Sequence, residues 1–151
     1  MKRQDRQIRQ SNAEDGDVLV SIWRSSVAAT HSFVSRSDLA AIDVEVQQLL
    51  PKIPAWLALD RSGQPIGFMA LADGAIEALF IAGGQQGRGV GRALVEHAMR
   101  GAESLTTVVN EQNEQAVGFY RYVGFEVVAR SPTDEQGRPY PILHMKWRGT
   151  R

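Results

Sequence analysis

The chain has 151 residues, of which 43% are hydrophobic and 23% charged, a balance typical of one soluble domain and unlike that of disordered chains. Seventeen Lys and Arg residues match seventeen Asp and Glu residues, so no global charge directs the protein to nucleic acid or a membrane surface. The absence of cysteine excludes a disulfide framework, a thiolate nucleophile and a Cys-based metal site, and we expect a single domain over residues 1–151, located in the cytoplasm, without a metal.

The first half of the chain combines helical and alternating patterns. Ser11 and Glu14 have the spacing of a capping box, which predicts that a helix begins there. Apolar residues then recur at helical spacing. The elements predicted in this half are a strand, two helices and the two arms of a hairpin, at residues 8–10, 11–27, 37–50, 55–59 and 66–71.

The second half alternates strands and helices. A strand at 75–81 leads into a glycine-rich turn at 83–91 and then into a helix. In the helix at 113–123 the apolar residues follow a spacing of three and four. The remaining strands are predicted at 105–109, 125–129 and 142–147.

The order of strand, glycine turn and helix is typical of a phosphate site. Such a turn gathers free backbone N–H groups at the positive end of the helix dipole. Arg88 and Arg92 lie in or next to the first helical turn, where a cation opposes the dipole unless an anion is bound. This segment predicts an anion site, although a turn without a ligand would have the same sequence.

Two common phosphate motifs do not fit this segment. A P-loop requires a Lys-Ser or Lys-Thr pair after the glycines, and the dinucleotide fingerprint requires a third glycine where Arg92 stands. A nucleotide such as ATP remains a possible ligand of the same backbone cradle.

Two segments resemble the GNAT superfamily of N-acetyltransferases. Residues 86–91, with the sequence QGRGVG, are similar to its coenzyme A pyrophosphate motif. Residues 113–125 are similar to its second block, an Asn-x-x-Ala-x-x-Phe-Tyr pattern followed by Gly-Phe. The order of predicted elements agrees with that family over nearly the whole chain, and residues 30–33 and 137–141 further resemble one of its bacterial members.

The resemblance implies a mixed α/β fold, with a bent, mostly antiparallel sheet of six to seven strands, a splayed parallel pair and helices on both faces. It also implies that the chain binds acetyl-CoA, whose pantetheine arm pairs with the edge of the strand at 79–81. The backbone N–H of Ile81 would stabilise the oxyanion. The residues so assigned to acetyl-CoA are Leu79, Phe80, Ile81, Gln86, Gly87, Arg88, Gly89, Val90, Gly91, Arg92, Asn113, Ala116, Phe119 and Tyr120.

Two side chains are candidates for catalysis. Tyr120 occupies the family's general-acid position, but it also lies on the apolar stripe of its helix and could be a core residue. Alternation predicts that Glu77 shares a strand face with Leu79 and Ile81, and its counterpart in some family members is a general base. An exposed strand carboxylate is the alternative for Glu77, and Asn113 could act as a helix N-cap, a ligand or both.

The acceptor amine is not identified by any motif. A protein lysine, a protein N-terminus and a small-molecule amine all fit, and a non-catalytic acyl-CoA sensor is the alternative to an enzyme. His31, Phe33 and Tyr140 are predicted to contact the acceptor because they lie in segments that could wall its pocket, although the two rings could equally be loop aromatics. We expect no nucleic-acid or membrane partner, and either a monomer or a homodimer.

Overall fold

The computed structural model describes residues 7–149, and within them one seven-stranded sheet is surrounded by four α-helices. The strands are β1 (Ile8–Gln10), β2 (Trp56–Leu59), β3 (Pro65–Ala72), β4 (Ala75–Ile81), β5 (Leu105–Asn110), β6 (Glu126–Ser131) and β7 (Ile142–Trp147). The helices are α1 (Gly16–Thr30), α2 (Arg36–Leu49), α3 (Val90–Arg100) and α4 (Glu114–Tyr122), with 3-10 turns η1 (Ala13–Asp15) and η2 (Leu50–Lys52).

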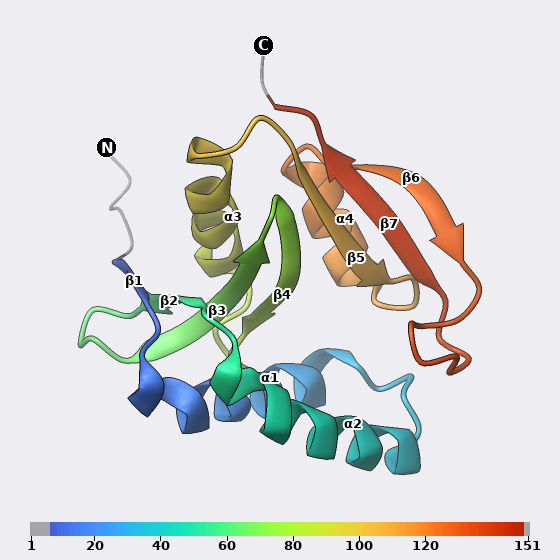
Figure 1. The fold of residues 1–151 in the computed structure, drawn as a ribbon, viewed down its shortest axis with the longest axis horizontal. Helices are drawn as coiled ribbons and strands as arrows, with labels where there is room; N and C mark the ends of the chain where they lie inside the picture. The colour runs from blue at the N-terminus through green and yellow to red at the C-terminus, as the bar shows by residue number, and fades with distance from the viewer. Residues whose placement is uncertain (1–6, 150–151) are drawn as a thin grey trace.

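The sheet is antiparallel except at its centre. Its strand order is β1-β2-β3-β4-β5-β7-β6, and only β4 and β5 run parallel. Figure 1 shows these two strands diverging, so that β1 to β4 form one arm and β5, β7 and β6 another. The expected mixed fold with a splayed parallel pair is confirmed. No helix within residues 7–149 is long and apolar enough to cross a membrane.

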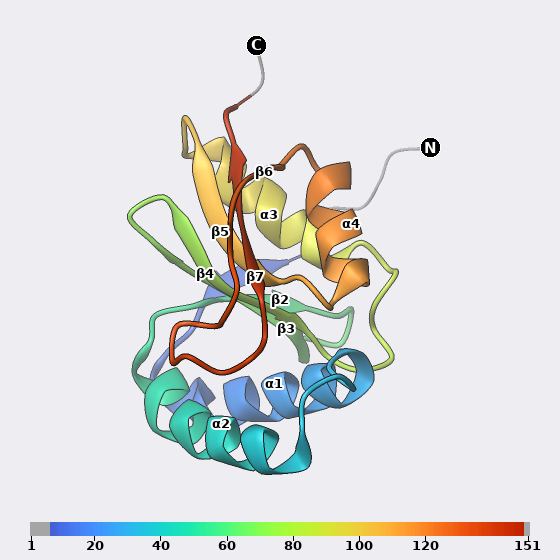
Figure 2. The same cartoon turned by 90° about the vertical axis from the view of Figure 1, so that its right-hand side faces the viewer.

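Helices cover both faces of the sheet, as expected. On one face, α1 buries an apolar stripe that includes Leu19 and Trp23 against Leu57 and Phe68 of the sheet. On the other face, α3 packs through Leu94 and its apolar neighbours. Figure 2 shows α1 and α2 on one side of the sheet and α3 and α4 on the other. The two apolar clusters fix the sheet between two helical layers.

The start of the first helical segment differs from the sequence-based prediction. The capping box consists of Asn12 and Asp15, not Ser11 and Glu14. The Asn12 side chain accepts from the N–H of Glu14, and the Asp15 carboxylate accepts from the N–H of Asn12 at 2.8 Å. The hydroxyl of Ser11 instead accepts a hydrogen bond from the N–H of Ala55, next to β2, at 2.9 Å. Because Ser11 makes this tertiary contact, the observed N-cap is Asn12, one residue after the predicted one.

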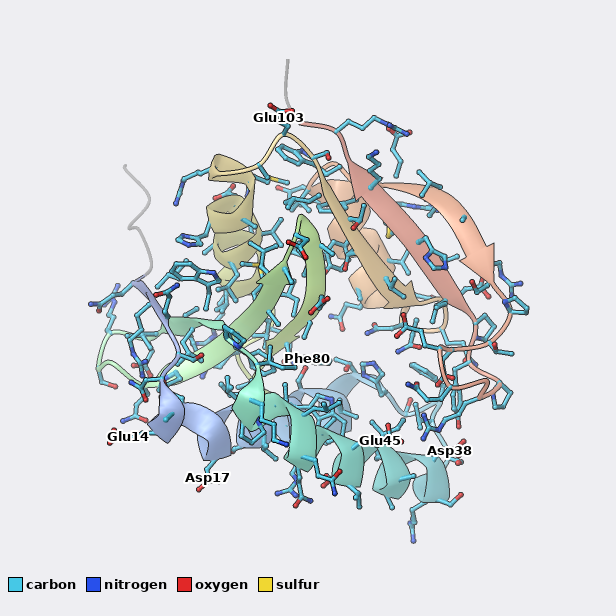
Figure 3. All side chains as sticks on the ribbon, in the orientation of Figure 1. Glu14, Asp17, Asp38, Glu45, Phe80 and Glu103 are labelled. Carbon is cyan, nitrogen blue, oxygen red and sulfur yellow. The ribbon has the colours of Figure 1, made fainter. Side chains whose placement is uncertain are left out.

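The loop between β6 and β7 is tied to α2. The Tyr140 hydroxyl donates to the Asp38 carboxylate, and the Arg138 guanidinium pairs with Glu45 at 3.1 Å. Figure 3 shows Asp38 and Glu45 on α2, with Asp38 at the end next to this loop. Because α2 packs beside α1, and α1 covers β2 and β3, these contacts connect the loop of one arm of the sheet to the other arm.

Gly67 of β3 offers a test of the packing between the sheet and α3. A Cβ at Gly67 would lie 2.9 Å from Cδ1 of Ile81 and 3.0 Å from Cγ1 of Val90. We expect Gly67→Ala to lower the free energy of unfolding by ~1–3 kcal/mol, because the added methyl overpacks a filled interior. Urea denaturation measures this change.

Gly118→Ala is the matched control. Gly118 is exposed within α4 and has no atom within 4 Å of an added Cβ. The same substitution there should stabilise the protein by ~0.5–1 kcal/mol, because alanine favours the helix. Equal effects at the two glycines would contradict the packing described for Gly67.

Candidate functional site

The split between β4 and β5 defines the site. The two strands pair at only two positions, Ala75 with Thr106 and Ile76 with Thr107. The buried hydroxyl of Thr107 donates to the carbonyl of Ile76 at 3.1 Å, at the last of these pairs. Beyond Ile76 the strands have no pairing, so the groups on the inner edge of β4 lack a strand partner.

The inner edge of β4 presents a defined set of backbone groups. The N–H of Ala82 donates to Ile66 of β3 at 2.9 Å. Because antiparallel pairing alternates, the backbone groups of Phe80 also face β3, whereas those of Leu79 and Ile81 face the split. The Ile81 carbonyl accepts from Nε2 of Gln86 at 3.0 Å. The N–H of Ile81 and both backbone groups of Leu79 remain available to a ligand.

A bulge in β4 changes the expected position of Glu77. Leu71 pairs with Ile76 and Ala70 pairs with Ala78, so Glu77 is the extra residue. The bulge interrupts alternation, and Ile76 joins the apolar cluster that contacts Leu79 and Ile81. The Glu77 side chain is exposed and borders the cavity at the split.

The glycine turn leaves the start of α3 open. Gly87 and Gly89 have φ angles of 79° and 81°, and nothing lies within 4 Å of a Cβ built on either. The first helical bond runs from the N–H of Ala93 to the carbonyl of Gly89, and no side chain caps the helix. The N–H groups of residues 90–92 therefore face outward with the positive end of the dipole. This is the geometry that a diphosphate requires.

The two arginines of this segment are placed differently. Arg92 borders the cavity, pairs with Glu96 at 2.9 Å and lies 5.5 Å from the ring centroid of Tyr122. Arg88 does not border the cavity. An anion at the start of α3 would thus meet Arg92 already held by two neighbours.

Helix α4 brings Tyr120 to the split. Asn113 is the N-cap, and its side chain accepts from the N–H of Ala116 at 3.2 Å. Tyr120 is 5% exposed, and burial raises its pKa to about 12 against a smaller lowering by a hydrogen bond with Thr107. Tyr120 is therefore a protonated phenol at neutral pH, held at the last paired position of the two strands.

One cavity of about 610 Å³ joins these groups. The last turns of α1 border it on one face of the sheet, and the start of α3 and part of α4 border it on the other. It therefore passes through the sheet where β4 and β5 separate. Every residue predicted to bind acetyl-CoA borders it except Arg88, and Glu77 and His31 border it too.

The three residues predicted to contact the acceptor form a row of rings. The centroids of His31 and Phe33 are 5.2 Å apart, and those of Phe33 and Tyr140 are 6.2 Å apart. Only His31 of the three borders the cavity. Tyr140 is 8% exposed and fixes the loop next to α2 through Asp38, so it contributes structure behind the cavity wall.

Sequence analysis missed several polar side chains of the cavity wall, among them one on β5 and two on α1. Thr107, Ser26 and Thr30 all border it. Thr107 could have been found, because it stands between Leu105 and Val109 on the inward face of an alternating strand. The other two follow the periodicity of α1 and carry no separate signal.

Comparisons with known proteins agree with this geometry. The profile of the acetyltransferase (GNAT) domain matches residues 29–148. The peptidyl-lysine N-acetyltransferase YjaB of Escherichia coli (strain K12) is 50% identical over 142 residues, which cover 94% of this chain and 97% of that protein.

Two solved structures share the arrangement. The solution structure of apo-form YjaB from Escherichia coli has a TM-score of 0.90 and 49% identity, covering 96% of this chain and 99% of the other. The PaiA N-acetyltransferase of Thermoplasma acidophilum, solved in complex with coenzyme A, has a TM-score of 0.74 and covers 96% and 99% of the two chains. At 20% identity this second likeness concerns the fold.

The hydroxyl of Thr107 should contribute to stability. In Thr107→Val the carbonyl of Ile76 and the hydroxyl of Tyr120 both lose a partner in a buried position. We expect the free energy of unfolding to fall by ~1–3 kcal/mol. Thr106→Val, at the exposed neighbouring position, should change it by less than ~0.5 kcal/mol. Indistinguishable denaturation midpoints for the two variants would contradict the role given to Thr107.

Proposed function

The chain belongs to the GNAT family of acetyltransferases, and we propose that it transfers the acetyl group of acetyl-CoA to the side-chain amine of a protein lysine. The observation that carries this proposal is the cavity that passes through the split sheet. An anion cradle opens on one face, and the space bounded by α1, Glu77 and His31 opens on the other. Two substrates can therefore meet at the inner edge of β4.

The residues that border the cavity fit acetyl-CoA. We propose that the N–H groups at the start of α3 hold its diphosphate, supported by Arg92. The free backbone groups of Leu79 and Ile81 would pair with the amides of its pantetheine arm, as an added strand does. Bound there, acetyl-CoA supplies an acetyl group activated as a thioester. The coenzyme A complex of PaiA, which shares this fold, supports the assignment.

We propose distinct roles for three groups at the split. The N–H of Ile81, which has no strand partner, stabilises negative charge on the thioester oxygen. Tyr120 directs its hydroxyl proton toward the departing sulfur, and its raised pKa keeps that proton in place at neutral pH. Glu77 provides a carboxylate on the acceptor side, where it attracts a cationic lysine; its role as general base stays a prediction.

A protein lysine is the acceptor that we favour. The name of the Escherichia coli relative, at 50% identity, supports a peptidyl lysine over an N-terminus or a small amine. The chain is an enzyme rather than an acyl-CoA sensor, because that relative is named as an N-acetyltransferase. Cytoplasmic location and the choice between monomer and homodimer stay predictions of the sequence.

Acetylation of peptides tests this function. Purified protein with acetyl-CoA should acetylate peptides that contain an internal lysine, and mass spectrometry should place the added acetyl group on the lysine side chain. The same peptides with an acetylated lysine and a free N-terminus are the control. Modification of the N-terminus alone, or no modification although calorimetry shows that acetyl-CoA binds, would contradict the proposal.

Tyr120→Phe in the same assay separates binding from chemistry. We expect kcat to fall by ~10²-fold or more, because the proton for the leaving sulfur is lost. The affinity for acetyl-CoA should stay within ~3-fold, since the ring that fills the core remains. In the wild type, the raised pKa predicts no loss of kcat through ionisation of Tyr120 up to pH 10. An unchanged kcat in the variant would remove Tyr120 from the mechanism.

A further inference from the structure

His31 is held at the end of α1 by an unusual pair of hydrogen bonds. The Thr30 hydroxyl lies 2.9 Å from the carbonyl oxygen of Ser26 and 2.7 Å from Nδ1 of His31. A hydroxyl has one proton, and a carbonyl can only accept. Both contacts are satisfied together only if Thr30 donates to Ser26 and accepts from Nδ1–H. The arrangement therefore selects the imidazole tautomer whose lone pair is on Nε2.

The other ring nitrogen of His31 is accessible. Among residues 7–149 Nε2 has no protein partner, and no buried side-chain nitrogen or oxygen lacks one. Nε2 is consequently in contact with solvent. His31 also borders the cavity, on the side of α1, and its Nε2 has no protein partner among the described residues. The ring of Phe33 lies against the imidazole, with the two ring centroids 5.2 Å apart and the planes tilted by 37°.

The surroundings of His31 favour its neutral form. Burial lowers its pKa below the ordinary value of 6.5, so the imidazole carries no charge at neutral pH. The other titratable side chains of the cavity are Glu77, Arg92, Tyr120 and Tyr122. Beyond Phe33 the neighbouring titratable groups are Tyr140 and Asp38, which are bonded to each other. The Nε2 lone pair of His31 is therefore not occupied by a proton at neutral pH.

We propose that Nε2 of His31 is the general base that takes the proton from the acceptor ammonium. This inference rests on the proposed function, and it assigns to His31 the proton transfer that the sequence had suggested for Glu77. Thr30 is the positioning residue, because its hydroxyl fixes the ring and the tautomer.

The proton balance of the reaction is complete with these groups. The ammonium gives one proton to Nε2, and the freed lone pair forms the bond from nitrogen to the acetyl carbon. When the bond from that carbon to sulfur breaks, sulfur keeps the electron pair and receives the hydroxyl proton of Tyr120, and the second proton of the nitrogen passes through solvent to restore the Tyr120 hydroxyl. The imidazolium returns its proton to solvent, so one lysine ammonium and acetyl-CoA yield acetyl-lysine, coenzyme A and one proton.

The pH dependence of the effect follows from the amine, and its size follows from the loss of one positioned general base. With a pKa of ~10.4, only about one lysine in 10³ is unprotonated at pH 7. Without a base, the reaction depends on that fraction, which rises tenfold with each pH unit. His31→Asn keeps an N–H donor near the position of Nδ1 and removes Nε2. We expect its kcat/KM at pH 7 to be ~10²–10³-fold below wild type, with the deficit shrinking about tenfold per unit toward pH 9.

Matched variants and a modified substrate make the experiment specific. A peptide whose lysine is replaced by an aminooxy side chain, a nucleophile already neutral at pH 7, should restore His31→Asn to within ~5-fold of wild type. His97→Asn, a histidine that stacks on Trp56 outside this cavity, should retain wild-type kcat/KM. Glu77→Gln should raise KM for lysine peptides and keep the wild-type pH profile. Calorimetry with coenzyme A verifies that each variant is folded.

Nitrogen NMR of the imidazole gives a readout that does not depend on activity. We expect ¹⁵N shifts at pH 7 to show Nδ1 protonated and Nε2 unprotonated, with a titration midpoint below 6.5. Thr30→Val should lose this tautomer preference, and Thr30→Ser should keep it. A proton on Nε2 in the wild type would overturn the proposal.

The outcomes separate the two levels of inference. If the wild type acetylates lysine while His31→Asn keeps its rate and pH profile, the base assignment is wrong and the function stands. If Glu77→Gln instead abolishes the fall of kcat/KM toward low pH that the wild type shows, Glu77 is the base. If the wild type acetylates no lysine peptide although it binds acetyl-CoA, the proposed function fails, whatever the NMR of His31 shows.

Discussion

The place where the sheet opens is determined by the short pairing between β4 and β5. The two strands form only two parallel pairs, and the hydrogen bond from Thr107 to the carbonyl of Ile76 lies at the second pair. Beyond that point neither strand supplies partners to the other, and the inner edge of β4 keeps free backbone groups in a protein interior. Unpaired backbone groups in such a place are costly unless water or a ligand satisfies them. The split is thus both the weakest part of the sheet and the part best suited to bind an extended, amide-containing substrate. Thr107 contacts both the carbonyl of Ile76 and the hydroxyl of Tyr120. The position of this proton donor therefore depends on the geometry of the sheet.

The cavity is built from different kinds of groups on the two faces of the sheet. On the side of α3, glycines with positive φ and an uncapped helix start create a backbone anion site, so recognition there requires almost no side-chain chemistry. On the side of α1, hydrogen-bonded polar side chains at the helix end orient His31, and Glu77 projects from a bulge. A site of the first kind depends little on side-chain identity, whereas a site of the second kind depends on the side chains that line it. This division explains why the acceptor is harder to identify than the acyl donor.

Local patterns predicted much of this structure, and long-range pairing decided the rest. The glycine turn, the Asn113 cap and the helix that carries Tyr120 depend on nearby residues, and they lie where the sequence indicated. The bulge at Glu77 could not be predicted, because it depends on the register of β4 against β3. The cap moved from Ser11 to Asn12 because Ser11 bonds to a residue 44 positions away. Phe33 and Tyr140 were placed near the acceptor by their segments, yet the contact between Tyr140 and Asp38 holds that ring behind the cavity wall.

The central claim is that the amides of Leu79 and Ile81 face the split and are satisfied by the substrate. Hydrogen exchange followed by NMR tests it residue by residue. In the free protein the amide protons of Leu79 and Ile81 should exchange much faster than that of Phe80, which faces β3, and saturating acetyl-CoA should slow the exchange of both. Equal protection of all three amides in the free protein, or no change in Leu79 and Ile81 when acetyl-CoA binds, would contradict this account.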